Sequence, residues 1–217
     1  MTDIVILGDS ISAICAAHTI IDSDTKYNLH LVSEKAELGL SGEAPGILTS
    51  WPPCPSHWLS EMGSQKPNEE SSAVRRSWLE KSLATQLSKR GCRIHLRTRV
   101  VSYKDNHVTI VGAGPLGSGN IHYDELLDLR DPDLGEIEWS GGVCLTEYAP
   151  EFGKQGNRSD GTTEVWWKNK EKPTGFWIQQ MNWVGDDPST SLIDDVREGT
   201  KLADLTVDTI IQTNPSQ

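Results

Sequence analysis

The first 34 residues constrain the fold more than any other stretch of this 217-residue chain. Residues 3–7 form a short apolar run with β-branched side chains, which stops at Gly8 and is followed by alanines at helical spacing. A second apolar run, residues 29–32, comes just before Glu34. This order predicts a strand, a tight turn, a helix and a second strand. The spacing from Gly8 to Glu34 is close to the roughly 20 residues that separate a dinucleotide-binding turn from the acidic group that holds a ribose.

The predicted turn keeps only part of the glycine pattern that a dinucleotide needs. In G-x-G-x-x-G, the first glycine allows the turn, the second admits the pyrophosphate and the third lets the helix pack closely. Here Gly8 holds the first position, and Ser10 and Ala13 replace the other two. We expect Ser10 to add bulk and Asp9 to add negative charge where the phosphate approaches, while Glu34 accepts hydrogen bonds from ribose hydroxyls. The alternative is an ordinary βαβ unit with a solvated strand end.

Charge and composition narrow the classes of partner. The chain has 31 acidic and 20 basic residues, a formal net charge of −11, so we expect neither a nucleic-acid nor a membrane partner. No apolar run approaches the roughly 18 residues of a membrane span, and the N-terminus leads straight into the first strand, so we expect a cytoplasmic protein. The four cysteines have no metal-ligand spacing and are expected to be free thiols, with no metal site. The oligomeric state is left open.

The middle of the chain alternates between loops and strong periodic segments. Residues 38–46 are glycine-rich and predict a loop near the cofactor edge, and residues 57–62 predict a short helical turn. Apolar side chains at helical spacing predict a helix from about 72 to 90, which Gly91 ends. Strands are expected from there on, at residues 93–97, 100–103 and 107–111.

A second glycine-rich stretch matches the dinucleotide pattern letter for letter. Residues 112–117 read GAGPLG and follow a predicted strand. The pattern indicates a nucleotide site only if a helix comes next, and here turn residues lead into another strand. We therefore interpret residues 94–129 as an antiparallel meander with a glycine-rich turn, which is favoured over a second nucleotide site.

The last third is rich in tryptophan. Five of the eight tryptophans fall between residues 139 and 183, where strands are expected at 142–145, 163–167 and 175–181, with a surface loop at 150–162. Packing in the core and on strand faces is the simpler interpretation of these rings, and an aromatic substrate pocket is the alternative. Gly185 and Asp186 then precede a predicted helix that runs to about residue 212 despite Gly199.

The order of these features resembles the glutathione-reductase-type FAD-binding fold of flavin monooxygenases, amino-acid oxidases and flavin-dependent halogenases. The matching features are the N-terminal βαβ unit, the helix with Arg75 and Arg76 that leads into the meander, and Gly185-Asp186 before the last helix. The resemblance implies that Asp186 meets the ribityl chain and pyrophosphate and that Arg75 or Arg76 lies near the cofactor. The full cofactor set that it implies is Gly8, Ser10, Ile11, Ser12, Glu34, Lys35, Arg75, Val100, Gly185 and Asp186.

The match to the halogenases is shorter than the match to the fold. Residues 42–45, GEAP, look like a halogenase loop, whereas the tryptophan-rich halogenase motif and its lysine have no counterpart. The implied fold class is α/β, a Rossmann-like FAD/NAD(P)-binding fold with a parallel sheet, an antiparallel meander and a small β-rich second lobe. The expected domains are residues 1–138 for nucleotide binding, with the meander at about 93–124, a tryptophan-rich lobe at 139–184, and a return to the first domain at 185–217.

Two functions follow as hypotheses. The first is an FAD-dependent oxidoreductase, similar to a monooxygenase, oxidase or halogenase, acting on a small substrate that the sequence does not identify, with an aromatic one as an open alternative. The alternative is a non-catalytic nucleotide- or partner-binding protein on a degenerate Rossmann-like scaffold; an NAD-binding domain is a weaker third hypothesis. No catalytic residue is assigned, because isolated histidines such as His57 and His95 are more often structural or exposed.

Overall fold

The computed structural model describes residues 2–23, 26–39, 44–63, 66–112, 117–130, 137–168 and 173–213. The chain divides into two compact units. The first comprises residues 1–40, 83–132 and 196–217, and the second comprises residues 41–82 and 133–195. The domain boundaries expected from the sequence place residues 41–82 in the nucleotide-binding domain. In the structure, this segment belongs to the same unit as the tryptophan-rich strands. Gly42 and Glu43 of the halogenase-like loop lie outside the described residues.

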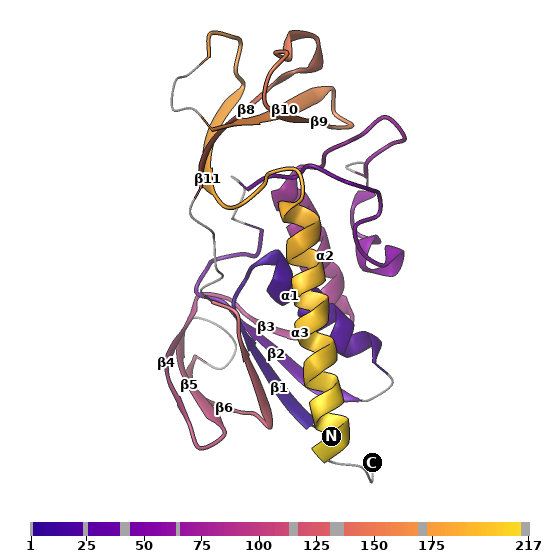
Figure 1. The fold of residues 1–217 in the computed structure, drawn as a ribbon. Coiled ribbons are helices and arrows are strands. Elements are labelled where there is room, and N and C mark those ends of the chain that lie inside the picture. The colour runs from indigo at the N-terminus through magenta and orange to yellow at the C-terminus, as the bar shows by residue number, and fades with distance from the viewer. Residues whose placement is uncertain are drawn as a thin grey trace. The chain divides into compact units, whose positions relative to one another are not determined.

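The first unit is built on a parallel sheet with the strand order β3-β2-β1-β7 (Figure 1). Its strands are β1 (Thr2–Leu7), β2 (Tyr27–Val32), β3 (Arg93–His95) and β7 (Glu125–Asp128). Leu7 pairs with Val32, so β1 and β2 end at the same edge of the sheet. Helix α1 (Ile11–Asp22) joins these two strands and is buried along most of its length. The βαβ unit expected from the sequence is therefore present, and it belongs to a mixed α/β fold, as predicted.

The meander is narrower than the sequence indicated. Strands β4 (Thr98–Lys104), β5 (His107–Gly112) and β6 (Ser118–His122) form an antiparallel sheet of their own. The expectation that residues 94–129 are all meander is wrong at both ends, because β3 and β7 pair in parallel with β2 and β1. A short apolar run has the same appearance in either kind of sheet, and only backbone pairing decides which partner it takes.

The second glycine-rich stretch connects two antiparallel strands, as predicted. Val111 pairs with Ser118, and the amide of Gly112 donates to the carbonyl of Gly117 at 2.9 Å. The stretch therefore opens no helix and no βαβ unit; residues 113–116 lie outside the described part of the chain. One face of the meander packs its apolar side chains on the parallel sheet, in a cluster of Val5, Leu7, Val32, Val108, Ile110 and Ile121.

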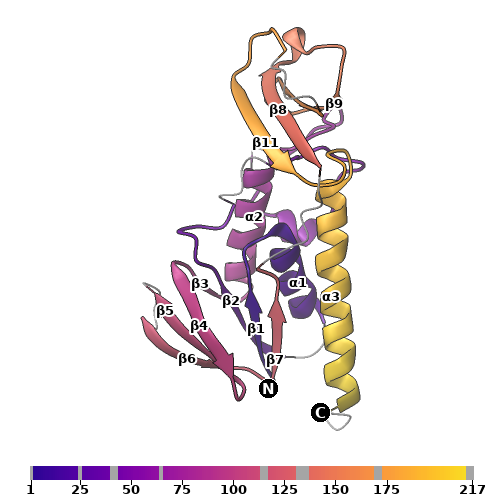
Figure 2. The ribbon, with the colours of Figure 1, turned by 60° about the vertical axis from the view of Figure 1, so that its left-hand side comes forward.

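Two long helices have residues in both units. They are α2 (Arg76–Lys89) and α3 (Ser191–Thr213). In the first unit, α3 runs beside α1 in both ribbon views (Figures 1 and 2). The reason is Gly199, where a Cβ would lie 2.1 Å from the carbonyl oxygen of Ser12. The glycine that looked like a weak point in the predicted helix is thus a point of close helix contact.

The second unit contains a four-stranded antiparallel sheet with the order β11-β8-β10-β9. Its strands are β8 (Glu138–Leu145), β9 (Lys154–Asn157), β10 (Thr162–Trp167) and β11 (Gln179–Val184), with short helices η1 (Ser56–Leu59) and η3 (Thr146–Tyr148). The loop expected at 150–162 contains β9, and β11 starts later than expected. Trp139 and Trp166 are buried in the core of this unit, as the simpler interpretation of the tryptophans requires.

A buried histidine pair joins β2 to β3. Nδ1 of His30 lies 2.9 Å from Nε2 of His95, and the two rings are stacked within 2° of parallel. Burial, together with the neighbouring His95 and Arg93, lowers the pKa of His30 to about 4. Burial likewise lowers the pKa of His95. His95 is therefore part of a packed pair in the sheet, which agrees with its omission from the catalytic candidates.

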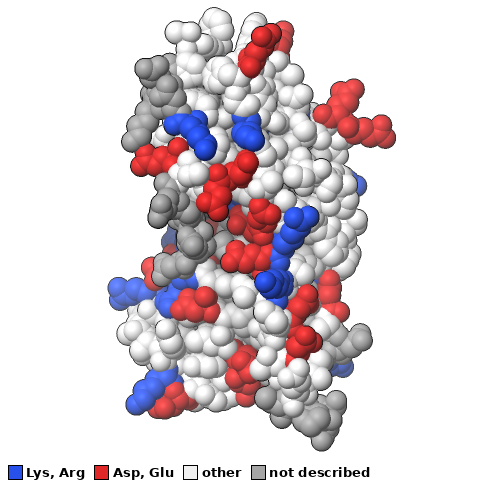
Figure 3. All heavy atoms as spheres, viewed as in Figure 1, with Lys and Arg blue, Asp and Glu red and all other residues white. Residues whose placement is uncertain are grey.

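The excess of carboxylates is visible on the surface. On the face shown in Figure 3, acidic groups are scattered among uncharged atoms and lysine and arginine occur in small groups beside them. Among the described residues, no helix combines the length and apolar character needed to cross a membrane.

Candidate functional site

The turn after β1 has the backbone conformation that requires glycine. Gly8 has φ +134°, which L side chains rarely adopt, and a Cβ there would lie 2.6 Å from the carbonyl oxygen of Leu129. Its amide donates to Val32 at 3.0 Å, which ties the turn to the end of β2. Gly8 thus occupies the position where a dinucleotide-binding turn needs its first glycine.

Ser10 is the N-cap of α1. Its Oγ accepts a hydrogen bond from the amide of Ala13 at 3.2 Å, and its carbonyl accepts from the amide of Ile14 at 3.1 Å. Among the described residues, the amides of Ile11 and Ser12 have no protein acceptor. The hydroxyl that was expected to obstruct a phosphate therefore bonds to the helix's own first turn, and two amides of that turn are left for an anion.

A small polar network crosses from this turn to the end of β2. The carboxylate of Asp9 accepts from the hydroxyl of Ser33 at 2.6 Å and pairs with Nζ of Lys35 at 3.0 Å. The charge of Asp9, expected to oppose a phosphate, is thus balanced by a neighbouring cation. Glu34 is exposed, and Ser33, which the sequence analysis passed over, is the residue of this segment that contacts the turn. The sequence offered only one indication of this role, namely that Ser33 directly follows the last apolar residue of β2.

Val100 and the two arginines have different surroundings. Val100 is partly buried against the cluster between the meander and the parallel sheet, next to a register shift in β4. Arg76 is buried, pairs with Glu80 at 3.1 Å and Asp195, and so serves the second unit's own packing. Arg75 is exposed, with its guanidinium 5.7 Å from the ring of Trp78. Of the two arginines, Arg75 is the one accessible to a ligand.

Gly185 and Asp186 follow β11 in the second unit. The carbonyl of Gly185 accepts from the indole of Trp139 at 3.0 Å, and a Cβ at Gly185 would lie 2.1 Å from the ring of Trp183. Asp186 is exposed. Asp187 caps the following turn instead, since the amide of Ser189 donates to it at 2.8 Å and lowers its pKa. The structure thus brings residues 8–12 and 33–35 together in the first unit, while Arg75, Gly185 and Asp186 belong to the second.

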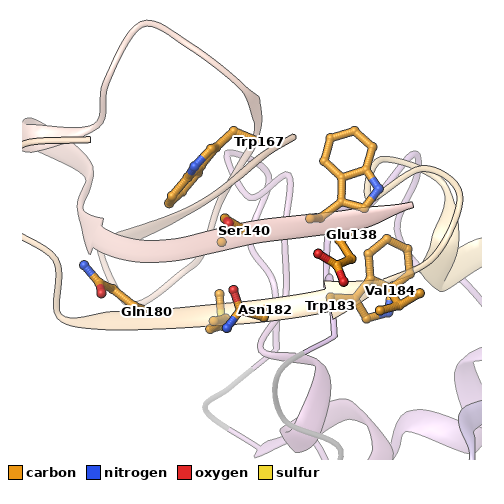
Figure 4. Close-up of a pocket in the computed structure, with 10 residues that line it drawn as sticks. Glu138, Ser140, Trp167, Gln180, Asn182, Trp183 and Val184 are labelled. Atoms are coloured by element: carbon orange, nitrogen blue, oxygen red, sulfur yellow. The ribbon is translucent and has the colours of Figure 1, made fainter. Parts of the chain in front are cut away.

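A cavity of about 730 Å³ opens on the sheet of the second unit. Figure 4 shows its side chains projecting from neighbouring strands. Trp167 pairs with Ser140, which pairs in turn with Asn182, so these three residues form one row across β10, β8 and β11 and share a face. The lining residues are Glu138, Trp139, Ser140, Gly141, Trp167, Gln180, Met181, Asn182, Trp183 and Val184.

Trp167 differs from three other tryptophans of the second unit in its hydrogen bonding. Its Nε1 is buried and has no acceptor among the described residues, whereas the indoles of Trp139, Trp166 and Trp177 all donate to protein oxygens. Trp177 lies against it with the ring centroids 5.4 Å apart. The row therefore offers a flat ring, a hydroxyl and an amide to a bound molecule.

Comparison with protein-family models and with curated proteins gives no match. Comparison with solved structures does. The chain is similar to p-nitrophenol 4-monooxygenase PnpA from Pseudomonas putida DLL-E4, with a TM-score of 0.67 and 8% identity over 98% of this chain and 82% of that one. It is also similar to glycine oxidase from Bacillus cereus ATCC 14579, with a TM-score of 0.66 and 9% identity over 96% of each chain.

A third similar structure is a flavoprotein/dehydrogenase from Cytophaga hutchinsonii, with a TM-score of 0.65 and 13% identity over 95% of this chain and 78% of that one. The chain spans less than two thirds of some other neighbours, such as 63% of CabE, an aromatic hydroxylase from angucycline biosynthesis. The fold is therefore the Rossmann-like, glutathione-reductase-type FAD-binding fold that the order of sequence features indicated.

Proposed function

We propose that this chain binds FAD and is an oxidoreductase acting on a small aromatic substrate. The observation that carries the proposal is the parallel β1-α1-β2 unit with a glycine turn at Gly8, in a fold that the chain shares with monooxygenase and oxidase structures. FAD would supply the redox chemistry, and the protein would supply binding and orientation.

The first unit offers groups suited to the adenosine and diphosphate parts of FAD. The amides of Ile11 and Ser12 lie at the positive end of α1 and would donate to the pyrophosphate, with Gly8 and Ser10 shaping the turn. Lys35 adds a cation, which Asp9 partly offsets. Exposed Glu34 would accept from ribose hydroxyls.

The remaining residues of the proposed cofactor set are taken from the fold resemblance. Exposed Asp186, with Gly185, would meet the ribityl side of the cofactor, and exposed Arg75 would supply a positive charge. Val100 would contribute apolar packing from the meander. These roles rest on the fold resemblance together with the accessibility of the side chains.

The cavity on the sheet of the second unit supports an aromatic substrate. A ring could stack on Trp167, and oxygen substituents could accept from the Asn182 amide. A cavity of about 730 Å³ is within the size range of small-molecule sites. The variant Trp167→Ala removes the stacking ring and should weaken the binding of an aromatic molecule in this cavity.

One observation favours the non-catalytic alternative. Two of the three glycines are replaced, and Asp9 places a carboxylate beside the turn that would receive the phosphates. A protein that binds a partner or a different nucleotide through the same scaffold would show no flavin chemistry. Affinity for FAD is therefore the quantity that separates the two hypotheses.

The experiment is purification without added flavin, followed by absorbance spectra and thermal denaturation with FAD, NAD or AMP. We expect flavin absorbance, release of FAD on denaturation, and a rise in Tm with FAD that exceeds the rise with AMP. Lys35→Ala should reduce the FAD effect, and Lys104→Ala, an exposed lysine on β4, is the matched control. Colourless protein with no change in Tm at saturating FAD would contradict the proposal, and a response to NAD alone would favour the third hypothesis.

A further inference from the structure

Three ligand-type side chains gather at the amino end of β1, at the opposite end of the strand from Gly8. One atom each from Asp3, His122 and Asp124 lies within 4.8 Å of the others, and His122 and Asp124 are exposed. Asp3 is the second residue of β1, His122 ends β6, and Asp124 precedes β7, so the cluster exists only because these strands meet. All belong to the first unit.

The two carboxylates are held by hydrogen bonds to neighbouring groups. The amide of Asp3 donates to Oδ2 of Asp124 at 2.8 Å, and the amide of Asp124 donates to the carbonyl of Asp3 at 2.8 Å. Nδ2 of Asn28 donates to Oδ1 of Asp3 at 2.5 Å. Oδ2 of Asp3 faces Nδ1 of His122 at 3.4 Å. Asp124 is therefore oriented through one oxygen and Asp3 through both, and each carboxylate oxygen still has a lone pair left for a ligand.

A second histidine lies beside the cluster. His107 pairs with His122 across β5 and β6, and the two ring centroids are 5.2 Å apart. Nδ1 of His107 lies 2.8 Å from the carbonyl oxygen of Asp105, so Nδ1 must carry the proton and donate. Nε2 of the neutral ring then presents a lone pair, which is the arrangement that metal-binding histidines commonly show.

We propose that Asp3, His122 and Asp124 bind one divalent transition-metal ion of the Zn²⁺ type, with water completing the coordination. A set of imidazole and carboxylate donors suits a tetrahedral zinc ion. The site lies roughly 16 Å from Gly8, given five residues of strand, so its role is to tie the meander to the parallel sheet. The expectation of no metal rested on cysteine spacing, which says nothing about ligands that only the fold assembles.

The test is a titration of the full-length chain, freed of any polyhistidine tag, with ZnCl₂ by isothermal titration calorimetry, together with thermal denaturation. We expect one ion per chain and a rise in Tm. Asp124→Asn and His122→Gln should each lower Zn²⁺ affinity at least about tenfold, and Asn28→Ala, which removes only the orienting donor, about tenfold. His57→Gln and Asp204→Asn, at exposed residues outside the ligand set, should bind as the unaltered protein does.

Loss of folding in a variant would not obscure the result. Co²⁺ added to the unaltered protein should broaden the NMR signals of the His122 and His107 rings before those of His57, because a paramagnetic ion acts at short range. Binding that survives both Asp124→Asn and His122→Gln, or broadening that begins at His57, would overturn the proposal, and so would the absence of any Zn²⁺ binding. None of these readouts depends on FAD.

Discussion

The two glycine-rich stretches of this protein differ both in their match to the dinucleotide pattern and in their structure, and the better match has the less suitable structure. Residues 112–117 carry the complete dinucleotide pattern, yet they connect antiparallel strands β5 and β6. The stretch that begins at Gly8 has one glycine of three, yet it joins a parallel strand to a buried helix. Only the Gly8 turn opens a helix, whose first amides are suited to an anion such as a phosphate.

The difference teaches that the first glycine and its flanking elements matter more to this fold than the full pattern. Gly8 has a backbone conformation and a close contact with Leu129 that a side chain would not permit. Gly117 also has positive φ, but the space around its Cβ position is open. The two glycines therefore differ in what the surrounding structure demands of them.

The largest expected effect comes from replacing these glycines with alanine. Gly8→Ala adds a methyl group 2.6 Å from the Leu129 carbonyl in a strained conformation, so we expect it to cost about 3 kcal/mol of stability and to abolish FAD binding. Gly117→Ala should cost about 1–2 kcal/mol, from its conformation alone, and leave FAD binding unchanged. Urea denaturation and FAD titration measure both. Equal effects of the two substitutions on FAD binding would contradict the conclusion that only the Gly8 turn contributes to a cofactor site.

Acid should weaken the sheet that carries the Gly8 turn. The pKa of His30 is about 4 in the folded chain and about 6.5 when unfolded, so the unfolded chain binds more protons between these values. Stability is full above pH 6.5 and falls as the pH drops toward 4, by at most about 3 kcal/mol from His30. The measurement is the free energy of unfolding as a function of pH.

A variant identifies the source of that pH dependence. His30→Gln with His95→Gln keeps polar groups in the pair and removes the titration, so it should flatten the profile between pH 6.5 and 4. His57→Gln, an exposed position, should leave the profile as it is. An unchanged slope in the double variant would show that other groups control acid stability.

A smaller effect is expected at Asp9. Asp9→Asn keeps an acceptor for the Ser33 hydroxyl and frees Lys35 from its carboxylate partner. We expect FAD to bind several-fold more tightly, because the net charge beside the turn becomes positive, at a loss of about 0.2–1 kcal/mol of stability for a partly exposed pair. Lower FAD affinity would mean that Asp9 positions Lys35 and does not oppose the phosphate.

The smallest change in stability is expected at Ser10. Ser10→Gly restores the second glycine and removes the cap on Ala13, which should cost a few tenths of a kcal/mol. It also frees a third amide of the α1 first turn, so FAD affinity should rise. Calorimetric titration with FAD checks this, and Ser12→Gly, two residues further along the chain, is the comparison variant. Weaker binding in Ser10→Gly would show that the capped helix end is the better phosphate site.

Much of the fold followed from local pattern. Apolar spacing and Gly91 predicted α2, and turn residues after Gly117 predicted the hairpin. The site was less predictable. Ser33 contacts Asp9 because β1 and β2 end in register, and His30 meets His95 because β2 and β3 are neighbours. Neither contact leaves a trace in a single sequence, since the partners are separated by 24 and 65 residues.

By itself, the sequence determined most of the turns, strands and helices, with β9 as an exception, because backbone conformation and hydrophobic periodicity act over a few residues. It also carried the resemblance to an FAD-binding fold through the order of those segments. Only the tertiary structure decided that β7 joins β1, that Arg76 is buried while Arg75 is exposed, and that Asp3, His122 and Asp124 meet. These outcomes depend on which strands pair and what they bury, and that is settled by packing across the whole unit.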